Sequence, residues 1–263
     1  MCRRLVIGVV AVLAAHPAAA QPQSDALSRS WTAIAGTATF SSRDVARFGP
    51  PADASPIAWE GIGETFAFRY ERTRPARLHR YDVGFSTTGR FTYDSPVRSI
   101  AADASDSARW IDGRYEYRRR ILGRKLSDRI DAGIGVQALG DILAISRHLA
   151  PSIESDEREG RVGVAGILAV RVHVSRRLAI EGVWANGLRL ARISIRQSAN
   201  ADGSIAQWGG GWSTDTSVRA DVPITPRASI VVDYLRTGEG TASHFHTYAA
   251  QTNRLAFGVR YGR

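Results

Sequence analysis

A serine and three histidines carry the side chains in this chain that are best suited to hydrolytic chemistry. The stretch ASHFHTY contains Ser243, His244 and His246, and SRHLAP contains His148. A serine hydrolase needs a nucleophile, a base and an orienting acid within hydrogen-bond reach of one another. Acidic residues that could act as the orienting partner are Asp106, Asp141 and Glu239. Ser243, His148, His244 and His246 are the candidate catalytic residues. The alternative is that they belong to solvated polar loops.

Metal and cofactor chemistry has little support in the sequence. His244 and His246 lie two residues apart, so they point the same way only if that segment is a strand, and no third ligand accompanies them. The only cysteine is Cys2, which lies in the predicted signal, so the mature chain has no disulfide and no thiolate site. We predict neither a metal nor a cofactor.

The N-terminus has the pattern of an export signal. Arg3 and Arg4 precede an apolar run over residues 5–15, and a small-x-small cleavage site ends at Ala20. The apolar run is too short to span a bilayer, which favours a cleaved signal over a retained anchor. The predicted organisation is a signal peptide over residues 1–20, a short periplasmic segment over 21–29 and one barrel domain over 30–263.

The charge of the chain is strongly basic. Its formal net charge is +10, and loss of Arg3 and Arg4 with the signal leaves +8. A basic exported protein can bind nucleic acid, an anionic surface or lipopolysaccharide phosphates. Because the positive residues are scattered along the chain and exported proteins seldom meet nucleic acid, we predict no nucleic-acid partner.

The elements that would position these residues are β-strands. In RYDVGFSTTGRFTYDS, apolar and polar residues alternate, which places one set on each face of a strand. The pattern recurs through the mature chain and predicts about ten strands. In RLAIEGVWANGLRLA the alternation is lost towards Ile193, so we expect a bulge or a membrane rim near Ala191.

The connections between the predicted strands alternate in length. Short ones such as ERTRPAR, SRR and PITPR are interleaved with longer ones such as SRHLAPSIESDERE and TGEGTASHFHTYAAQT. This order is typical of transmembrane barrels, which have short periplasmic turns and longer extracellular loops.

The two faces of the predicted strands differ in chemistry. One face holds Val, Ile, Leu and aromatic residues, and the other holds small residues together with charges of both signs. Buried charges are tolerable only when paired, so the second face predicts a salt-bridged lumen. The predicted lumen charges are Arg69, Glu71, Asp82, Arg90, Arg114, Glu116, Arg118, Asp131, Arg171, Glu181, Asp215, Arg219 and Asp233.

Aromatic residues on the apolar face gather towards the strand ends. Two such bands match the two interfaces of a membrane, which predicts that this face contacts lipid. The predicted lipid-facing aromatics are Phe66, Phe68, Tyr70, Tyr81, Phe85, Phe91, Tyr93, Tyr115, Tyr117, Trp184, Trp208, Trp212, Tyr234, Phe257 and Tyr261. A soluble barrel or sandwich is the alternative.

With these features the mature chain resembles the bacterial outer-membrane β-barrel superfamily. The last strand, with Leu255, Phe257, Val259 and Tyr261, resembles the C-terminal assembly signal of that superfamily, but Gly262 and Arg263 follow where members usually end on an aromatic residue. The resemblance implies the barrel assembly machinery as a partner. The superfamily also includes enzymes that act at the outer rim, such as lipid A deacylases, in which a His and a Ser two residues apart act together. The spacing here differs, because Ser243 adjoins His244 and lies three residues before His246.

The sequence therefore predicts an all-β fold, a single closed antiparallel up-and-down transmembrane barrel in the bacterial outer membrane. Because about ten strands enclose a narrow lumen, a general porin is not expected. We expect a non-enzymatic envelope or surface protein, or a low-conductance pore, in contact with outer-membrane lipid and lipopolysaccharide. The alternative is an outer-rim hydrolase acting on lipid A, phospholipid or peptide; the sequence does not identify an extracellular ligand.

Overall fold

The computed structural model describes most of the chain after its N-terminus. The described ranges are 28–46, 57–94, 106–122, 129–150, 153–175, 177–197, 204–243 and 246–262. The predicted signal peptide and His244 lie outside them. Within these ranges, no helix has the length and apolar character needed to cross a membrane.

Ten β-strands account for nearly all of the described residues. They are β1 (Ser28–Ala46), β2 (Ile57–Arg74), β3 (Arg77–Asp94), β4 (Ser107–Leu122), β5 (Ile130–Ala150), β6 (Ile153–Ser175), β7 (Leu178–Gln197), β8 (Ser204–Pro223), β9 (Ala228–Ser243) and β10 (His246–Gly262).

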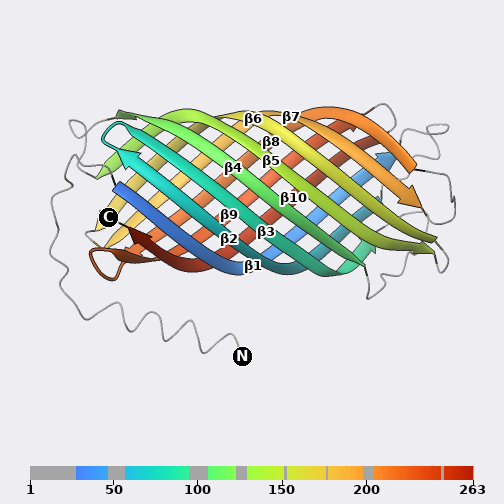
Figure 1. The fold of residues 1–263 in the computed structure, drawn as a ribbon, viewed down its shortest axis with the longest axis horizontal. Helices are drawn as coiled ribbons and strands as arrows, with labels where there is room; N and C mark the ends of the chain where they lie inside the picture. Colours follow the sequence, from blue (N-terminus) through green and yellow to red (C-terminus); the bar gives the residue numbers. More distant parts are fainter. Residues whose placement is uncertain are drawn as a thin grey trace.

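The strands close into one barrel. Each strand pairs antiparallel with the next along the chain, and β1 pairs with β10 from Ser30 opposite Gly262 to Ala46 opposite His246. The strands run obliquely to the long axis, as Figure 1 shows. The predicted fold class, a closed antiparallel up-and-down barrel, is confirmed.

The two ends of the barrel differ in their connections. The end that carries Ser28, Gly262 and the turns at residues 75–76 and 224–227 is called the turn end, and the opposite end the loop end. At the loop end, two of the segments expected as long loops are mostly paired strand. β5 continues to Ala150 and β6 begins at Ile153, and β9 continues to Ser243 and β10 begins at His246.

The bulge expected near Ala191 is also absent. β7 pairs with β6 and β8 through Ala191 without a change of register. Leu190 is exposed, and Ala191 and Ile193 are buried, so side chains continue to alternate between the two sides of the wall. Up to Leu190 the apolar residues point outward, and from Ala191 onward they point inward. The other expectation for this position, a membrane rim, stays a prediction; a rim would produce such a reversal.

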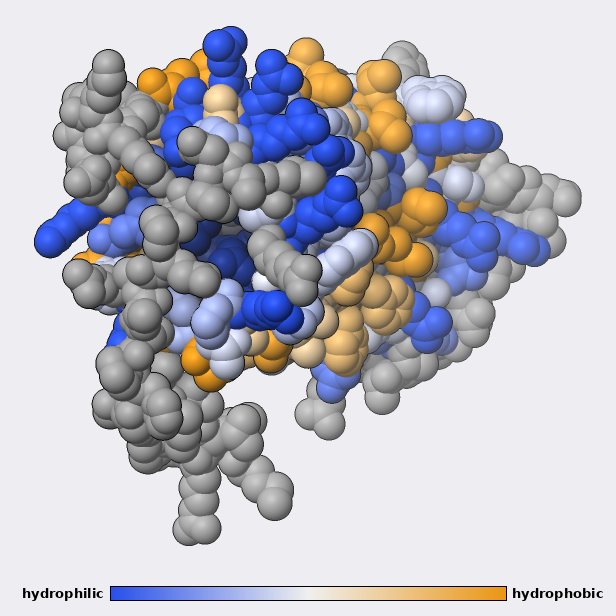
Figure 2. All heavy atoms as spheres, turned by 60° about the vertical axis from the view of Figure 1, so that its left-hand side comes forward, coloured by the Kyte–Doolittle hydropathy of each residue, from blue (hydrophilic) through white to orange (hydrophobic). Residues whose placement is uncertain are grey.

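The reversal divides the barrel into two sections. In the section towards the turn end, apolar side chains cover the outer wall and charged side chains point inward. Towards the loop end, polar residues such as Arg43, Arg109 and Arg192 are exposed outside. The residues buried inside there include apolar ones such as Ile193, although β6 also buries Glu157 and Glu159. Figure 2, which brings the turn end forward, shows hydrophobic residues on the wall and hydrophilic residues around the mouth.

Candidate functional site: the barrel lumen

Arg80 is the centre of the ion pairs nearest the turn end. Its Nε donates to Glu71 Oε1 at 2.6 Å, its Nη2 to Glu181 Oε1 at 2.6 Å, and its Nη1 to Glu116 Oε2 at 3.3 Å. β3 and β7 lie four strands apart around the barrel, so the pair with Glu181 crosses the lumen. Arg219 on β8 reaches Glu71 on β2 at 2.8 Å and crosses it in another direction.

A second level of pairs lies further along the lumen. Arg254 on β10 donates to Asp112 on β4 at 2.8 Å, and Arg69 on β2 donates to Asp233 on β9 at 2.8 Å. The absence of a side chain at Gly84 makes room for the first pair, because a Cβ there would lie 2.4 Å from Arg254 Nη1 and 2.6 Å from Asp112 Oδ1. Backbone and ion pair are therefore in contact at this level.

A third group of ion pairs approaches the loop end. Arg189 on β7 contacts Glu239 on β9 at 2.6 Å and Asp141 on β5 at 3.0 Å. Arg161 on β6 binds the same two carboxylates. Three levels of the lumen are thus bridged by guanidinium–carboxylate pairs, the strongest of the ordinary side-chain hydrogen bonds.

An apolar cluster lies inside the lumen beside this third group. Phe40 stacks on Trp59 with ring centroids 4.6 Å apart, and it meets Trp110 at 5.7 Å. β1 and β4 are three strands apart, so the second contact crosses the lumen. The buried members of the cluster are Ala38, Phe40, Trp59, Ala108, Trp110, Leu143, Ile145 and Ala250.

The structure brings most of the predicted lumen charges together. Nine of the thirteen are buried, namely Arg69, Glu71, Asp82, Glu116, Arg118, Glu181, Asp215, Arg219 and Asp233. Arg114 is nearly so and lies 3.8 Å from Asp215. Asp131 and Arg171 are half-buried at the turn end, and the Arg90 side chain lies outside the described part of the chain.

The sequence prediction missed several members of this network. Arg80, Asp112, Arg161, Arg189 and Arg254 are buried and paired across the lumen. Each lies an even number of residues along its strand from another residue of the polar face, and this spacing could have identified it as a lumen residue.

The predicted lipid-facing aromatics whose side chains are described lie on the outer wall. Phe66, Phe68, Trp184, Trp208 and Phe257 are among the exposed ones. The side chains of Phe91 and Tyr93 fall outside the described part. Half-buried aromatics gather near the turn end on β2 to β4, where the row of rings formed by Tyr70, Tyr81 and Tyr115 also includes Trp31, which the prediction omitted.

The candidate catalytic residues fall into separate places at the loop end. His148 Nδ1 lies 3.0 Å from Asp106 Oδ1, and the His148 backbone N–H donates to the same oxygen at 2.8 Å. Asp106 is buried and His148 is half-exposed. Ser243 and His246 end β9 and begin β10, four and five strands from β5. Only the histidine–acid pair of the expected arrangement is formed within the described residues.

Metal-binding side chains do not cluster in the parts of the chain that the structure describes. No group of three or more His, Cys, Asp or Glu side chains there is arranged to hold a metal ion.

Comparison with known proteins identifies the architecture through structure alone. No family model matches the sequence, and no curated protein matches it. The structure of OmpT, the outer-membrane protease of Escherichia coli, superposes with a TM-score of 0.65 over 93% of this chain and 99% of that one, at 9% identity. The chain has the fold of the bacterial outer-membrane β-barrels.

Other outer-membrane barrels resemble this one less closely. OprG of Pseudomonas aeruginosa gives a TM-score of 0.38 at 9% identity, covering 88% of this chain and 95% of its own. Ail of Yersinia pestis gives 0.33 at 12% identity, covering 88% and 98%. At these identities the likeness concerns the fold, so the role of this outer-membrane barrel must be argued from its own residues.

Proposed function

We propose that this chain is a closed, non-conducting outer-membrane barrel that serves as a non-enzymatic envelope or surface protein. The turn end faces the periplasm, and the section with the apolar outer wall spans the membrane. The loop-end section then lies outside the membrane, where the connections between its strands can contact external partners. The barrel fold and the apolar wall support this placement.

The observation that carries the proposal is the bridged lumen. Ion pairs between opposite walls, such as Arg80–Glu181 and Arg254–Asp112, are followed by the contact of Phe40 with Trp110. An ion passing through would have to separate buried pairs and then cross an apolar layer, and both steps are costly.

Conductance in planar bilayers tests this directly. We expect no steady current steps from the purified barrel where a general porin in the same bilayer conducts. A variant that combines Phe40→Gly, Trp59→Gly and Trp110→Gly should remain closed, because the ion pairs nearer the turn end still bridge the lumen. Steady ohmic steps from the unmodified protein would contradict the proposal and assign a low-conductance pore instead.

The contact of His148 with Asp106 favours a second candidate, a rim hydrolase. A buried carboxylate that orients a half-exposed imidazole is the arrangement of a general base, and such a base can act on a water or hydroxyl. OmpT, which shares the fold, is a protease. The substrate classes to test are peptide, phospholipid and lipid A.

A matched pair of variants separates the two candidates. His173 contacts Asp131 at 3.4 Å near the turn end and provides a second histidine–acid pair away from the rim. The rim hydrolase predicts activity that is lost in His148→Ala and retained in His173→Ala. Our proposal predicts no hydrolysis by the unmodified barrel, whose folding is verified by a heat-induced shift in electrophoretic mobility.

A further inference from the structure

The mouth at the turn end contains a cavity of about 330 Å³. Its walls come from the start of β1, the two turns at residues 75–76 and 224–227, and the turn-end parts of β3 to β7 and β10. Nine arginines and three carboxylates line it, and Glu116 and Asp221, just behind the lining, pair with four of these arginines. Positive charge is therefore in excess at this mouth. A concave surface with charge of one sign concentrates the field and attracts anions.

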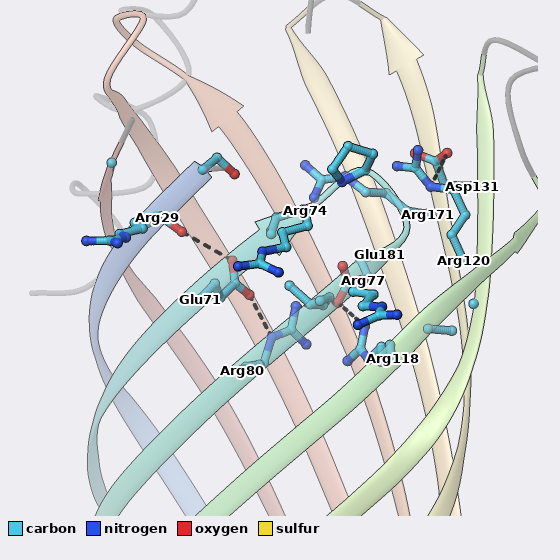
Figure 3. A pocket seen from close by; sticks show the side chains of 18 of the residues that line it. Arg29, Glu71, Arg74, Arg77, Arg80, Arg118, Arg120, Asp131, Arg171 and Glu181 are labelled. Atoms are coloured by element: carbon cyan, nitrogen blue, oxygen red, sulfur yellow. Dashed lines mark hydrogen bonds and ion pairs between the residues drawn. The ribbon is translucent and has the colours of Figure 1, made fainter. Parts of the chain in front are cut away.

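The three carboxylates of the cavity are already engaged. Glu71 and Glu181 each accept a hydrogen bond from Arg80 at 2.6 Å. Asp131 lies 3.3 Å from Arg120. These pairs form the floor and one side of the cavity, as Figure 3 shows, and they hold their arginines in place.

Four arginines of the cavity remain unpaired within the described residues, because Arg118 also pairs with Glu181, and Arg171 and Arg260 both pair with Asp221. Arg29, Arg74, Arg77 and Arg227 are exposed, and none of them forms an ion pair with another residue in the described ranges. They come from β1, from both sides of the turn between β2 and β3, and from the turn between β8 and β9. Figure 3 shows Arg74 and Arg77 near Glu71 and Arg80, and Arg29 at the side of the mouth with its side chain directed away from them.

We propose that this arginine mouth binds a phosphate oxyanion. Guanidinium groups match the geometry of phosphate oxygens and bind them with two hydrogen bonds at once. Several guanidinium groups arriving from separate elements can surround one phosphate group, while the ion pairs below fix the floor of the site.

The headgroup of an anionic phospholipid in the inner leaflet is the source that the structure favours. The rings of Trp31 and Tyr70 lie on the outer wall beside the mouth with their centroids 4.2 Å apart, and the ring of Tyr81 continues the row. Such aromatic rows lie at the headgroup level of a membrane, and basic clusters there attract anionic lipids. The lipid source rests on the proposed membrane placement, whereas the oxyanion site does not.

Native mass spectrometry of the full barrel in nanodiscs tests the lipid source. We compare discs of phosphatidylcholine alone with discs that also contain phosphatidylglycerol. The barrel should retain phosphatidylglycerol at least about ten-fold over phosphatidylcholine, and added salt should weaken the retention because the interaction is ionic. A variant combining Arg29→Gln, Arg74→Gln, Arg77→Gln and Arg227→Gln should lose this preference.

The control removes the same charge from the other end of the barrel. It combines Arg43→Gln, Arg109→Gln, Arg158→Gln and Arg196→Gln, four exposed arginines near the loop end. A heat-induced shift in electrophoretic mobility verifies that both variants fold. The control variant should keep the preference for phosphatidylglycerol.

Titration of the detergent-solubilised barrel with inorganic pyrophosphate separates the two sources. Pyrophosphate binding that is lost in the mouth variant supports the oxyanion site without requiring a membrane, even if the membrane placement is wrong. Lipid preference without pyrophosphate binding supports the headgroup source. Absence of both, or equal loss in the mouth and control variants, overturns the proposal.

Discussion

The barrel contains two sections with opposite chemistry inside and outside. Towards the turn end, exposed residues such as Val83 and Val170 cover the wall, and Arg80 and Glu181 are buried inside. Towards the loop end, Arg192 is exposed outside, and Ile193 is buried inside. β6 and β7 pass from one section to the other without a change of register, whereas β2 and β3 shift register at Gly61 and Ile62.

The difference shows that the surroundings of the wall determine what the lumen must contain. Where the wall is apolar, as in a membrane span, the lumen holds the polar side chains, and these must pair with one another. Where the wall is polar, the strands bury apolar side chains inside as a soluble barrel does. One continuous sheet therefore encloses a charged core first and then a core in which an apolar cluster lies beside buried carboxylates such as Glu159.

The largest expected effect comes from breaking the charged core. Arg80→Met removes a guanidinium shared by Glu71, Glu116 and Glu181 and leaves three buried carboxylates with one partner fewer. We expect the free energy of unfolding to fall by about 3–5 kcal/mol. Urea unfolding in detergent micelles, followed by tryptophan fluorescence, measures it. Arg77→Met is the control at the same end, and an equal loss there would contradict the importance of pairing.

The apolar core should be somewhat less sensitive to a single truncation. Phe40→Ala removes a fully buried ring that contacts Trp59 and Trp110, and we expect a loss of about 3 kcal/mol. Phe68→Ala on the outer wall, where the ring is half-exposed, should cost less than half as much in the same unfolding assay. If both truncations cost the same, the apolar cluster is not a packed core.

The smallest effect concerns the outer walls and sharpens the position of the rim. Val164→Arg places a charge on the apolar wall of β6 and should cost about 2 kcal/mol in lipid vesicles. Thr92→Arg near the loop end lies on the polar side of the rim, so its cost should stay within about 0.5 kcal/mol. Equal costs would show that both positions have the same surroundings.

Much of the fold follows from the alternation in the sequence. Tyr81 to Phe85 and Leu255 to Tyr261 show strict period-two patterns, and every strand predicted from such a pattern exists. The predicted strands were too short at the loop end. At Leu143, Trp59 and Ile193 the apolar residues change sides, so a search for one apolar face stops at the rim although the strand continues.

The sequence by itself determined the strands, the apolar wall and the charged character of the opposite face, because these depend on neighbours along one strand. Only the tertiary structure decided which charges meet, since Arg80–Glu181 and Arg254–Asp112 join strands that lie four apart around the barrel. It also brought His148 to Asp106, and it gathered arginines from separate turns at one mouth. Closure of the sheet sets those distances, and no local pattern of residues records them.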